Sequence, residues 1–172
     1  MLDGKSTYYS ESVTITVKDP YVHNGGILNH YYGNGGLVNI PADLSLTEIG
    51  AFAFSNFDYI PKGPGDEISE DSPETTKIWF IGDDTIEEVI IPEGVKTIGP
   101  YAFANLTALK RVVLPSTLER IDQGAFYGCT SLKMVEGLGS VKFINQNAFA
   151  NCALEGSVKL DSVVALADYA FF

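Results

Sequence analysis

The chain has few basic residues: 11 Lys and Arg stand against 22 Asp and Glu in 172 residues, which gives a formal net charge of −11. Phosphate binding needs clustered lysine and arginine, so this excess of acid argues against nucleic acid as a partner. The negative charge also predicts repulsion from anionic membranes. No apolar run approaches the roughly 20 residues that span a bilayer. We therefore expect no membrane insertion.

Histidine and cysteine are scarce, which restricts catalysis and metal binding. His23 and His30 are the only histidines, and Cys129 and Cys152 are the only cysteines. No nucleophile, base and orienting group share a neighbourhood in the sequence, and no spacing typical of zinc or calcium ligands is present. We interpret the histidines as solvated or hydrogen-bonded turn residues. The sequence predicts no enzyme activity and assigns no catalytic, cofactor or metal residue.

The two ends of the chain carry little that locates the protein. The amino terminus lacks the apolar segment of a signal peptide, but Met1-Leu2 could also begin a mature domain. At the other end the chain stops at Phe171-Phe172, in the middle of a repeat. We expect either that the protein continues there or that this uncapped carboxyl-terminal end contacts a partner.

What the chain does contain is a repeated Ala-Phe dipeptide. The copies end at Phe54, Phe103, Phe126, Phe149 and Phe171, and the last four are spaced by 23, 23 and 22 residues. A period in the twenties is typical of solenoids, in which each repeat buries its apolar side by stacking on its neighbours. We predict one stack of about six repeats of roughly 23 residues.

Columns of equivalent residues support this alignment. Five positions before each phenylalanine the residue is always aliphatic: Ile49, Ile98, Ile121, Ile144 and Leu166. The next residue predicts a bend at Gly50, Gly99, Asp122, Asn145 and Ala167. Two positions after the phenylalanine stand Asn56, Asn105, Gly128 and Asn151, which tolerate a left-handed backbone and predict the end of a short helical segment. Cys129 and Cys152 share the column of Leu106, so we predict buried, free core thiols; a disulfide between stacked neighbours is the alternative.

Each repeat also contains a strand. In the regular copy 109–114, alternation places Val112 and Leu114 toward the core and Arg111 and Val113 outward. Prolines end such strands at Pro41, Pro92 and Pro115, where a missing N–H removes no ladder bond. Because successive strands run the same way along the stack, we predict one parallel sheet with about one strand per repeat.

Two regions depart from the period. Phe80 lies 23 residues before Phe103 and begins a degenerate copy with strand residues Ile86, Val89 and Ile91, although an alternative alignment makes 77–80 itself a strand. Residues 61–76 are rich in Pro, Gly and acidic side chains and predict an irregular acidic excursion from the stack. Residues 1–36 lack the period and predict an amino-terminal β-rich cap, with a strand at 13–17 and two glycine turns, followed by the solenoid at 37–172.

The pattern Ile-Gly-Pro-Tyr-Ala-Phe-Ala-Asn-Leu-Thr-Ala-Leu-Lys-Arg-Val-Val-Leu-Pro at 98–115 resembles the BspA-like, or treponemal-type, leucine-rich repeat. Residues 32–41 are similar to the lead-in of a first repeat in that family. The resemblance covers 37–172, with departures at 61–76 and 135–138. It implies an α/β repeat fold, a curved right-handed leucine-rich-repeat solenoid with a parallel sheet. Members of that family are carried on bacterial cell-surface or secreted proteins, and several are adhesins or host-protein binders. The resemblance therefore also implies an extracellular or cell-surface location.

Solenoids of this shape usually bind ligands on the concave face of the sheet. The strand register predicts that its outward residues are Glu88, Ile90, Arg111, Val113, Met134, Glu136, Ser157 and Lys159. We expect a non-enzymatic module that binds a protein or a glycan through this face and the neighbouring acidic excursion at 61–76. A structural spacer without its own ligand is the alternative. An exposed apolar patch on this face would favour binding, and a uniformly polar one would favour the spacer.

Overall fold

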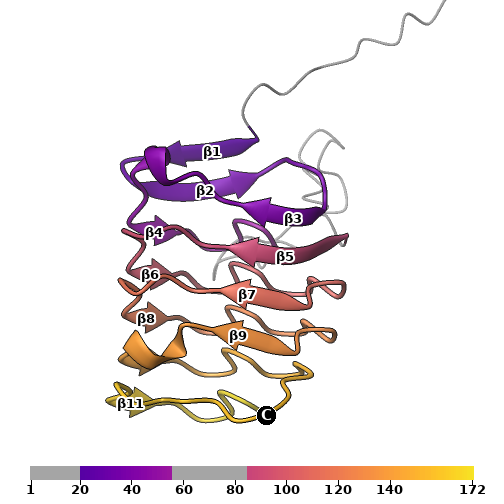
Figure 1. Ribbon diagram of the computed structural model, residues 1–172, viewed down its shortest axis with the longest axis vertical. Helices are drawn as coiled ribbons and strands as arrows, with labels where there is room; N and C mark the ends of the chain where they lie inside the picture. Colours follow the sequence, from indigo (N-terminus) through magenta and orange to yellow (C-terminus); the bar gives the residue numbers. More distant parts are fainter. Residues whose placement is uncertain (1–19, 56–84) are drawn as a thin grey trace, which may run out of the picture.

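The computed structural model describes residues 20–55 and 85–172, which form a stack of coils carrying two sheets (Figure 1). The seven-stranded sheet has the order β1 (Tyr21–Asn24), β2 (Ile27–Tyr31), β4 (Glu48–Ile49), β6 (Thr97–Ile98), β8 (Arg120–Ile121), β10 (Phe143–Ile144) and β11 (Ala165–Leu166). The four-stranded sheet has the order β3 (Gly36–Asn39), β5 (Ile86–Ile90), β7 (Arg111–Val113) and β9 (Met134–Glu136). Two short 3-10 helices, η1 (Ala42–Leu44) and η3 (Leu138–Ser140), complete the described elements.

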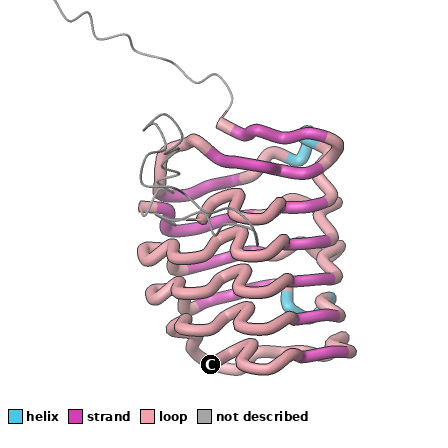
Figure 2. Tube along the Cα trace, turned by 180° about the vertical axis from the view of Figure 1, so that it is seen from behind, coloured by secondary structure: helices cyan, strands magenta, loops and turns pink. Residues whose placement is uncertain are grey.

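The parallel solenoid is confirmed, but most coils carry two strands where the sequence predicted one. The aliphatic column forms two-residue strands of its own, with Ile49, Ile98, Ile121 and Ile144 in register from coil to coil. Each of these isoleucines is buried. A two-residue strand is too short for alternation to show, which is why the second sheet escaped the sequence pattern. Figure 2 shows the two sets of strands on opposite sides of the coils.

The four-stranded sheet follows the predicted pattern through β9. Val112 and Leu114 are buried, while Arg111 and Val113 are half-buried on the outer face. The strand predicted around 157–159 does not form. Gly156 adopts φ 83, which interrupts the extended backbone, and Glu155 marks the last backbone hydrogen bond to this side of the preceding coil, from its N to Lys133 O at 3.1 Å. Ser157 and Lys159 are exposed but lie beyond the sheet.

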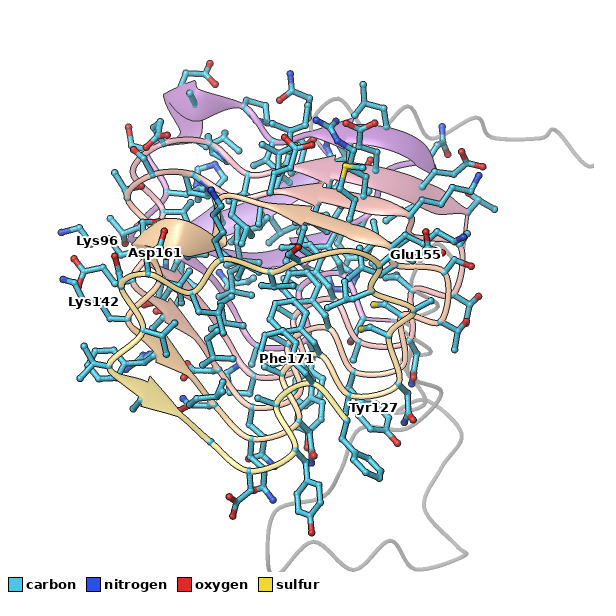
Figure 3. The ribbon with its side chains drawn as sticks, turned by 60° about the horizontal axis from the view of Figure 1, so that its bottom comes forward. Lys96, Tyr127, Lys142, Glu155, Asp161 and Phe171 are labelled. Carbon is cyan, nitrogen blue, oxygen red and sulfur yellow. The ribbon has the colours of Figure 1, made fainter. Side chains whose placement is uncertain are left out.

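The Ala-Phe segments form consecutive turns and not the short helical segment that the sequence predicted. In one copy, Ala102 N donates to Gly99 O at 3.3 Å and Ala104 N donates to Tyr101 O at 3.2 Å. The phenylalanine rings stack through the core, with centroids 5.1 Å apart between Phe103 and Phe126. The stack extends from Phe54 to Phe171, and Figure 3 shows Phe171 at its end.

Left-handed residues shape these turns in two columns. The predicted column is confirmed at Asn105 (φ 60), Gly128 (φ 73) and Asn151 (φ 59). A second column, two residues before each phenylalanine, was not predicted: Phe52, Tyr101, Gly124, Asn147 and Tyr169 also have positive φ. Gly124 and Asn147 were the signal for it, but the aromatic residues in the other copies concealed the shared geometry.

The amino-terminal hairpin is part of the stack. β1 and β2 pair antiparallel around Gly25 and Gly26, whose φ values are 58 and 81, as two-residue hairpin turns require. β2 then pairs in parallel with β4, which aligns buried Leu28 with Ile49. The hairpin therefore extends the seven-stranded sheet at the end of the solenoid (Figure 1). Both histidines lie on its strands and not in turns.

Several predictions fall outside the described residues. These are the strand at 13–17, the acidic excursion at 61–76, the two alignments of 77–80, and the left-handed Asn56. The division between cap and solenoid at residues 36 and 37 stays a prediction.

Candidate binding surface

The outer face of the four-stranded sheet carries two rows of side chains that run along the stack. In register, the first row is Leu37, Glu88, Arg111 and Met134, and the second is Asn39, Ile90, Val113 and Glu136. Six of the eight predicted residues lie here, and we call these eight side chains the sheet surface. Leu37 and Asn39 were missed, although buried Val38 and Ile40 followed by Pro41 repeat the pattern of the later strands.

Arg111 lies at the centre of the sheet surface and joins two carboxylates. Its Nε donates to Glu136 Oε1 at 2.9 Å, and its guanidinium forms an ion pair with Glu88 on the other side. The hydrogen bond to Glu136 raises the pKa of Arg111, and the negative charges of both glutamates add to that effect. Glu88 and Arg111 thus form a cross-strand ion pair, and Glu136 extends it to a triplet.

Apolar side chains stand at both ends of the first row. Leu37 is 61% exposed and Met134 is 52% exposed. In the middle of the second row, Ile90 and Val113 are half-buried and adjacent in register. The sheet surface is therefore mixed, with an ionic centre, an apolar strip and exposed apolar ends.

Further ion pairs follow the same coil-to-coil spacing at the margins. On the side of the four-stranded sheet, Lys110 Nζ lies 2.9 Å from Glu87 Oε1 and Lys133 Nζ lies 2.6 Å from Glu155 Oε1. On the other side, Lys142 Nζ lies 3.1 Å from Glu119 Oε2. Figure 3 shows Lys142 and Glu155 at opposite margins. These pairs are exposed, and pairs of this kind add little to stability.

The cysteines take part in packing. Sγ of Cys129 donates to Phe103 O at 3.1 Å, and Sγ of Cys152 donates to Phe126 O at 3.1 Å. Both thiols are free. Burial raises the pKa of Cys129 well above its ordinary value, which disfavours a reactive thiolate. The buried free thiol is confirmed for Cys129, whereas Cys152 is only partly buried.

The histidines are part of the hairpin. The ring of His30 packs against Tyr32 with centroids 4.2 Å apart, and burial lowers the pKa of His30. Across residues 20–55 and 85–172, no three His, Cys, Asp or Glu residues gather as a metal site would require. In the same ranges no helix has the length and apolar character to cross a bilayer.

The stacked coils, the phenylalanine column and the parallel sheets define a bacterial type of leucine-rich-repeat solenoid. The chain belongs to the BspA type leucine rich repeat region family, whose pattern matches residues 67–172 in six copies. The sequence predicted about six repeats over the longer range 37–172, which includes the copy with Phe54. The coil with Phe54 precedes the matched range, yet its ring belongs to the same stack.

Solved structures of bacterial leucine-rich repeat proteins are similar to this chain to different degrees, and the one from Bacteroides ovatus shows the same kind of fold. A leucine-rich repeat protein from Bacteroides ovatus ATCC 8483 has a TM-score of 0.60 and 22% identity, over 88% of this chain and 36% of that one. One from Eubacterium ventriosum ATCC 27560 has a TM-score of 0.41 and 25% identity, over 88% and 46%. A leucine rich cell surface protein from Faecalibacterium prausnitzii A2-165 has a TM-score of 0.35 and 21% identity, over 78% and 45%. The chain spans less than half the length of these proteins. No curated protein matches it.

Proposed function

We propose that the chain is a non-enzymatic binding module that takes a protein ligand on the sheet surface. The observation that carries this proposal is the contrast between the two faces of the four-stranded sheet. The inward register position between the two rows is valine on every strand: Val38, Val89, Val112 and Val135. The outward first row changes from leucine to glutamate, arginine and methionine. Packing explains the constant column, and the variable row is available for recognition.

The chemistry of the sheet surface suits a protein partner. Methionine and arginine are enriched at the centres of protein interfaces, and charged groups at a rim set specificity and association rate. Exposed Leu37 and Met134 supply apolar area that the fold does not require. Positively charged groups of the ligand would lie opposite Glu88 and Glu136. The triplet that these glutamates form with Arg111 would thereby set the orientation of the partner. The chain's net charge of −11 favours a partner with a basic patch.

We place the protein at the bacterial cell surface or outside the cell. The resemblance to BspA-like proteins supports this location. Fractionation of the source cells, followed by immunodetection with and without protease treatment of intact cells, tests it. Protection of the protein from external protease would contradict a surface location.

A structural spacer is the second candidate, and the ion pairs favour it. Four basic residues each pair with a glutamate one coil away, which gives the stack a solvated, charged surface without any ligand: Lys110, Arg111, Lys133 and Lys142. The exposed apolar ends of the sheet surface distinguish the two candidates, since a spacer gains nothing from them.

A binding screen separates the candidates. The whole chain is immobilised and tested by biolayer interferometry against a panel of extracellular-matrix proteins and glycans. Arg111→Ala, at the centre of the sheet surface, and Met134→Glu, at its exposed apolar end, are each expected to weaken a protein ligand by about 10-fold or more. Lys142→Ala, an exposed ion-paired lysine on the other side, serves as the matched control and should change binding less than about 2-fold. No binding by any panel member would favour the spacer, and binding that ignores Met134 and Arg111 would move the site elsewhere.

A further inference from the structure

A shallow polar groove lies on the other side of the molecule, where the chain leaves the seven-stranded sheet. Its volume of about 550 Å³ falls within the range of small-ligand sites. The lining comes from four successive coils: Pro100, Arg120, Asp122, Gln123, Asn145, Gln146 and Ala167. At a coil spacing of about 4.8 Å, three steps give a groove roughly 14 Å long. Unlike most small-ligand sites, its lining is mainly polar.

The turn does not require the polar groups of this groove. Asp122 and Asn145 occupy the position that is glycine in two other coils, Gly50 and Gly99. The backbone alone closes the turn, since Ala125 N donates to Asp122 O at 3.2 Å. The Asp122 carboxylate is directed sideways, to Asn145 on the next coil. The fold therefore does not require the polar side chains of Asp122 and Asn145.

The groove is held in place before any ligand arrives. Asp122 Oδ1 accepts from Asn145 Nδ2 at 2.7 Å and lies 3.2 Å from Arg120 Nε. The Asp122 side chain is only 17% exposed. Among the described residues, both partners of the Asp122 carboxylate contact Oδ1, so Oδ2 can accept from solvent or a ligand. A preorganised acceptor of this kind reduces the entropy lost on binding.

The amides beside Asp122 add donors and acceptors in planar groups. Gln123 Nε2 donates to the Tyr101 hydroxyl at 3.1 Å, and the Tyr101 ring stacks on Phe52 at 5.6 Å. Gln146 is exposed, and its side-chain amide makes no hydrogen bond to the described part of the chain. The ion pair of Arg120 and Asp122 leaves the lining without net charge. Pro100 and Ala167 place small apolar surfaces at the two ends.

We infer that this groove binds a neutral oligosaccharide, at a site separate from the sheet surface. Sugar hydroxyls both donate and accept, and amide, carboxylate and guanidinium groups side by side satisfy both roles. The apolar ends suit the C–H faces of the rings. An anionic ligand would meet the Asp122 carboxylate without an excess of cations to balance it. The elongated shape suits a chain of sugars and not a single one.

Saturation-transfer NMR on the whole chain tests this inference. The probes are linear hexasaccharides of glucose, mannose, galactose and xylose, with hexagalacturonate as the charged comparison. At least one neutral probe should bind, and Gln146→Ala should weaken it by about 3- to 10-fold, the effect of losing neutral hydrogen bonds. Asn39→Ala is the matched control, because it removes an exposed amide from the sheet surface. Circular dichroism confirms that each variant is folded.

The outcomes are distinct from those of the protein-binding proposal. Met134→Glu should leave the sugar signal unchanged, since Met134 lies on the other sheet. The inference is overturned if no neutral hexasaccharide binds, if hexagalacturonate binds best, or if Gln146→Ala leaves the signal as it was. Loss of the signal in Asn39→Ala or Met134→Glu would place sugar binding on the sheet surface, and would also overturn it.

Discussion

At the scale of single residues, the fold depends on a few repeated positions with separate physical roles. The phenylalanine fills the core, the aliphatic residue five positions earlier anchors the second sheet, and asparagine or glycine two positions later accepts a left-handed backbone. The three columns could be predicted from the sequence because each is filled by a narrow set of side chains, but the strand that the aliphatic column forms could not. The left-handed position at Tyr101 and Tyr169 could not, because tyrosine gives no signal for positive φ.

Removing a core ring should destabilise the stack strongly. Phe126 is buried and stacks on both Phe103 and Phe149. Phe126→Ala is expected to lower the free energy of unfolding by about 3–5 kcal/mol, measured by urea denaturation, because it empties a core layer. Phe172→Ala, at a ring that is 82% exposed, should change it by less than about 0.5 kcal/mol. Equal effects of the two variants would contradict the packed column.

The two thiols should differ in reactivity. In Cys152→Ser the remaining thiol, Cys129, is buried with a raised pKa, so a thiol reagent should label it only after denaturation. In Cys129→Ser the remaining Cys152 is partly buried and should react slowly in the folded protein. The measurement is the rate at which each variant is labelled under native conditions. Rapid labelling of Cys129 in the folded protein is the result that this account does not allow.

At the scale of elements, short strands and turns repeat with a strict coil-to-coil geometry. The four-stranded sheet could be predicted because alternation and the terminal prolines mark its strands. The seven-stranded sheet could not, since its parallel strands offer mostly two residues each. The prediction for Ser157 and Lys159 was wrong for a different reason. It assumed that the strand register continues for one more repeat, but Gly156 with φ 83 ends the extended backbone there.

We expect that only glycine is tolerated directly after β9, at Gly137, because of both the backbone conformation and the close contacts there. Gly137 has φ 91, and a Cβ at this position would lie 2.4 Å from Leu114 O. Gly137→Ala is expected to lower the free energy of unfolding by about 1–3 kcal/mol because it combines backbone strain with a clash. Gly139, two residues later, has open space around its Cβ direction, so Gly139→Ala should be close to neutral. Thermal melting of the pair decides the point, and a tolerated Gly137→Ala would refute it.

One turn should contribute to stability in a pH-dependent way. Glu93 accepts hydrogen bonds from Ser116 N at 2.9 Å and Ser116 Oγ at 3.0 Å, which link two coils. The backbone hydrogen bond from Ser116 lowers the pKa of Glu93 below its ordinary 4.5. A lowered pKa means that this stabilisation is present above the ordinary value and is lost as the pH falls through the folded-state value.

Glu93→Gln should therefore make the protein less sensitive to acid. Urea denaturation at pH 7 and at about pH 3 should show a smaller loss of stability in the variant than in the original chain. The other carboxylates titrate in both proteins, so the difference between them isolates Glu93. Identical losses in the two proteins would show that the Glu93 bonds do not survive in solution.

At the scale of the whole molecule, a narrow repeat geometry leaves broad surfaces whose side chains the fold does not dictate. The stack, its hairpin and six of the eight sheet-surface residues could be predicted, because all of them follow from the period and the strand register. The groove at Asp122 and Gln146 could not. Asp122, Asn145 and Ala167 belong to a bend column that the sequence explained by geometry alone. Their convergence with the neighbouring residues of four coils exists only in three dimensions.

The central claim is that ligand recognition uses the sheet surface, and NMR mapping of a bound ligand tests it most directly. Backbone amide resonances are followed as the tightest protein ligand from the binding screen is titrated into the labelled chain. The account predicts that shifts concentrate on β3, β5, β7 and β9, centred on Arg111, and fade toward β6, β8 and β10. Shifts confined to the seven-stranded sheet, or shifts spread evenly along the stack, would contradict it.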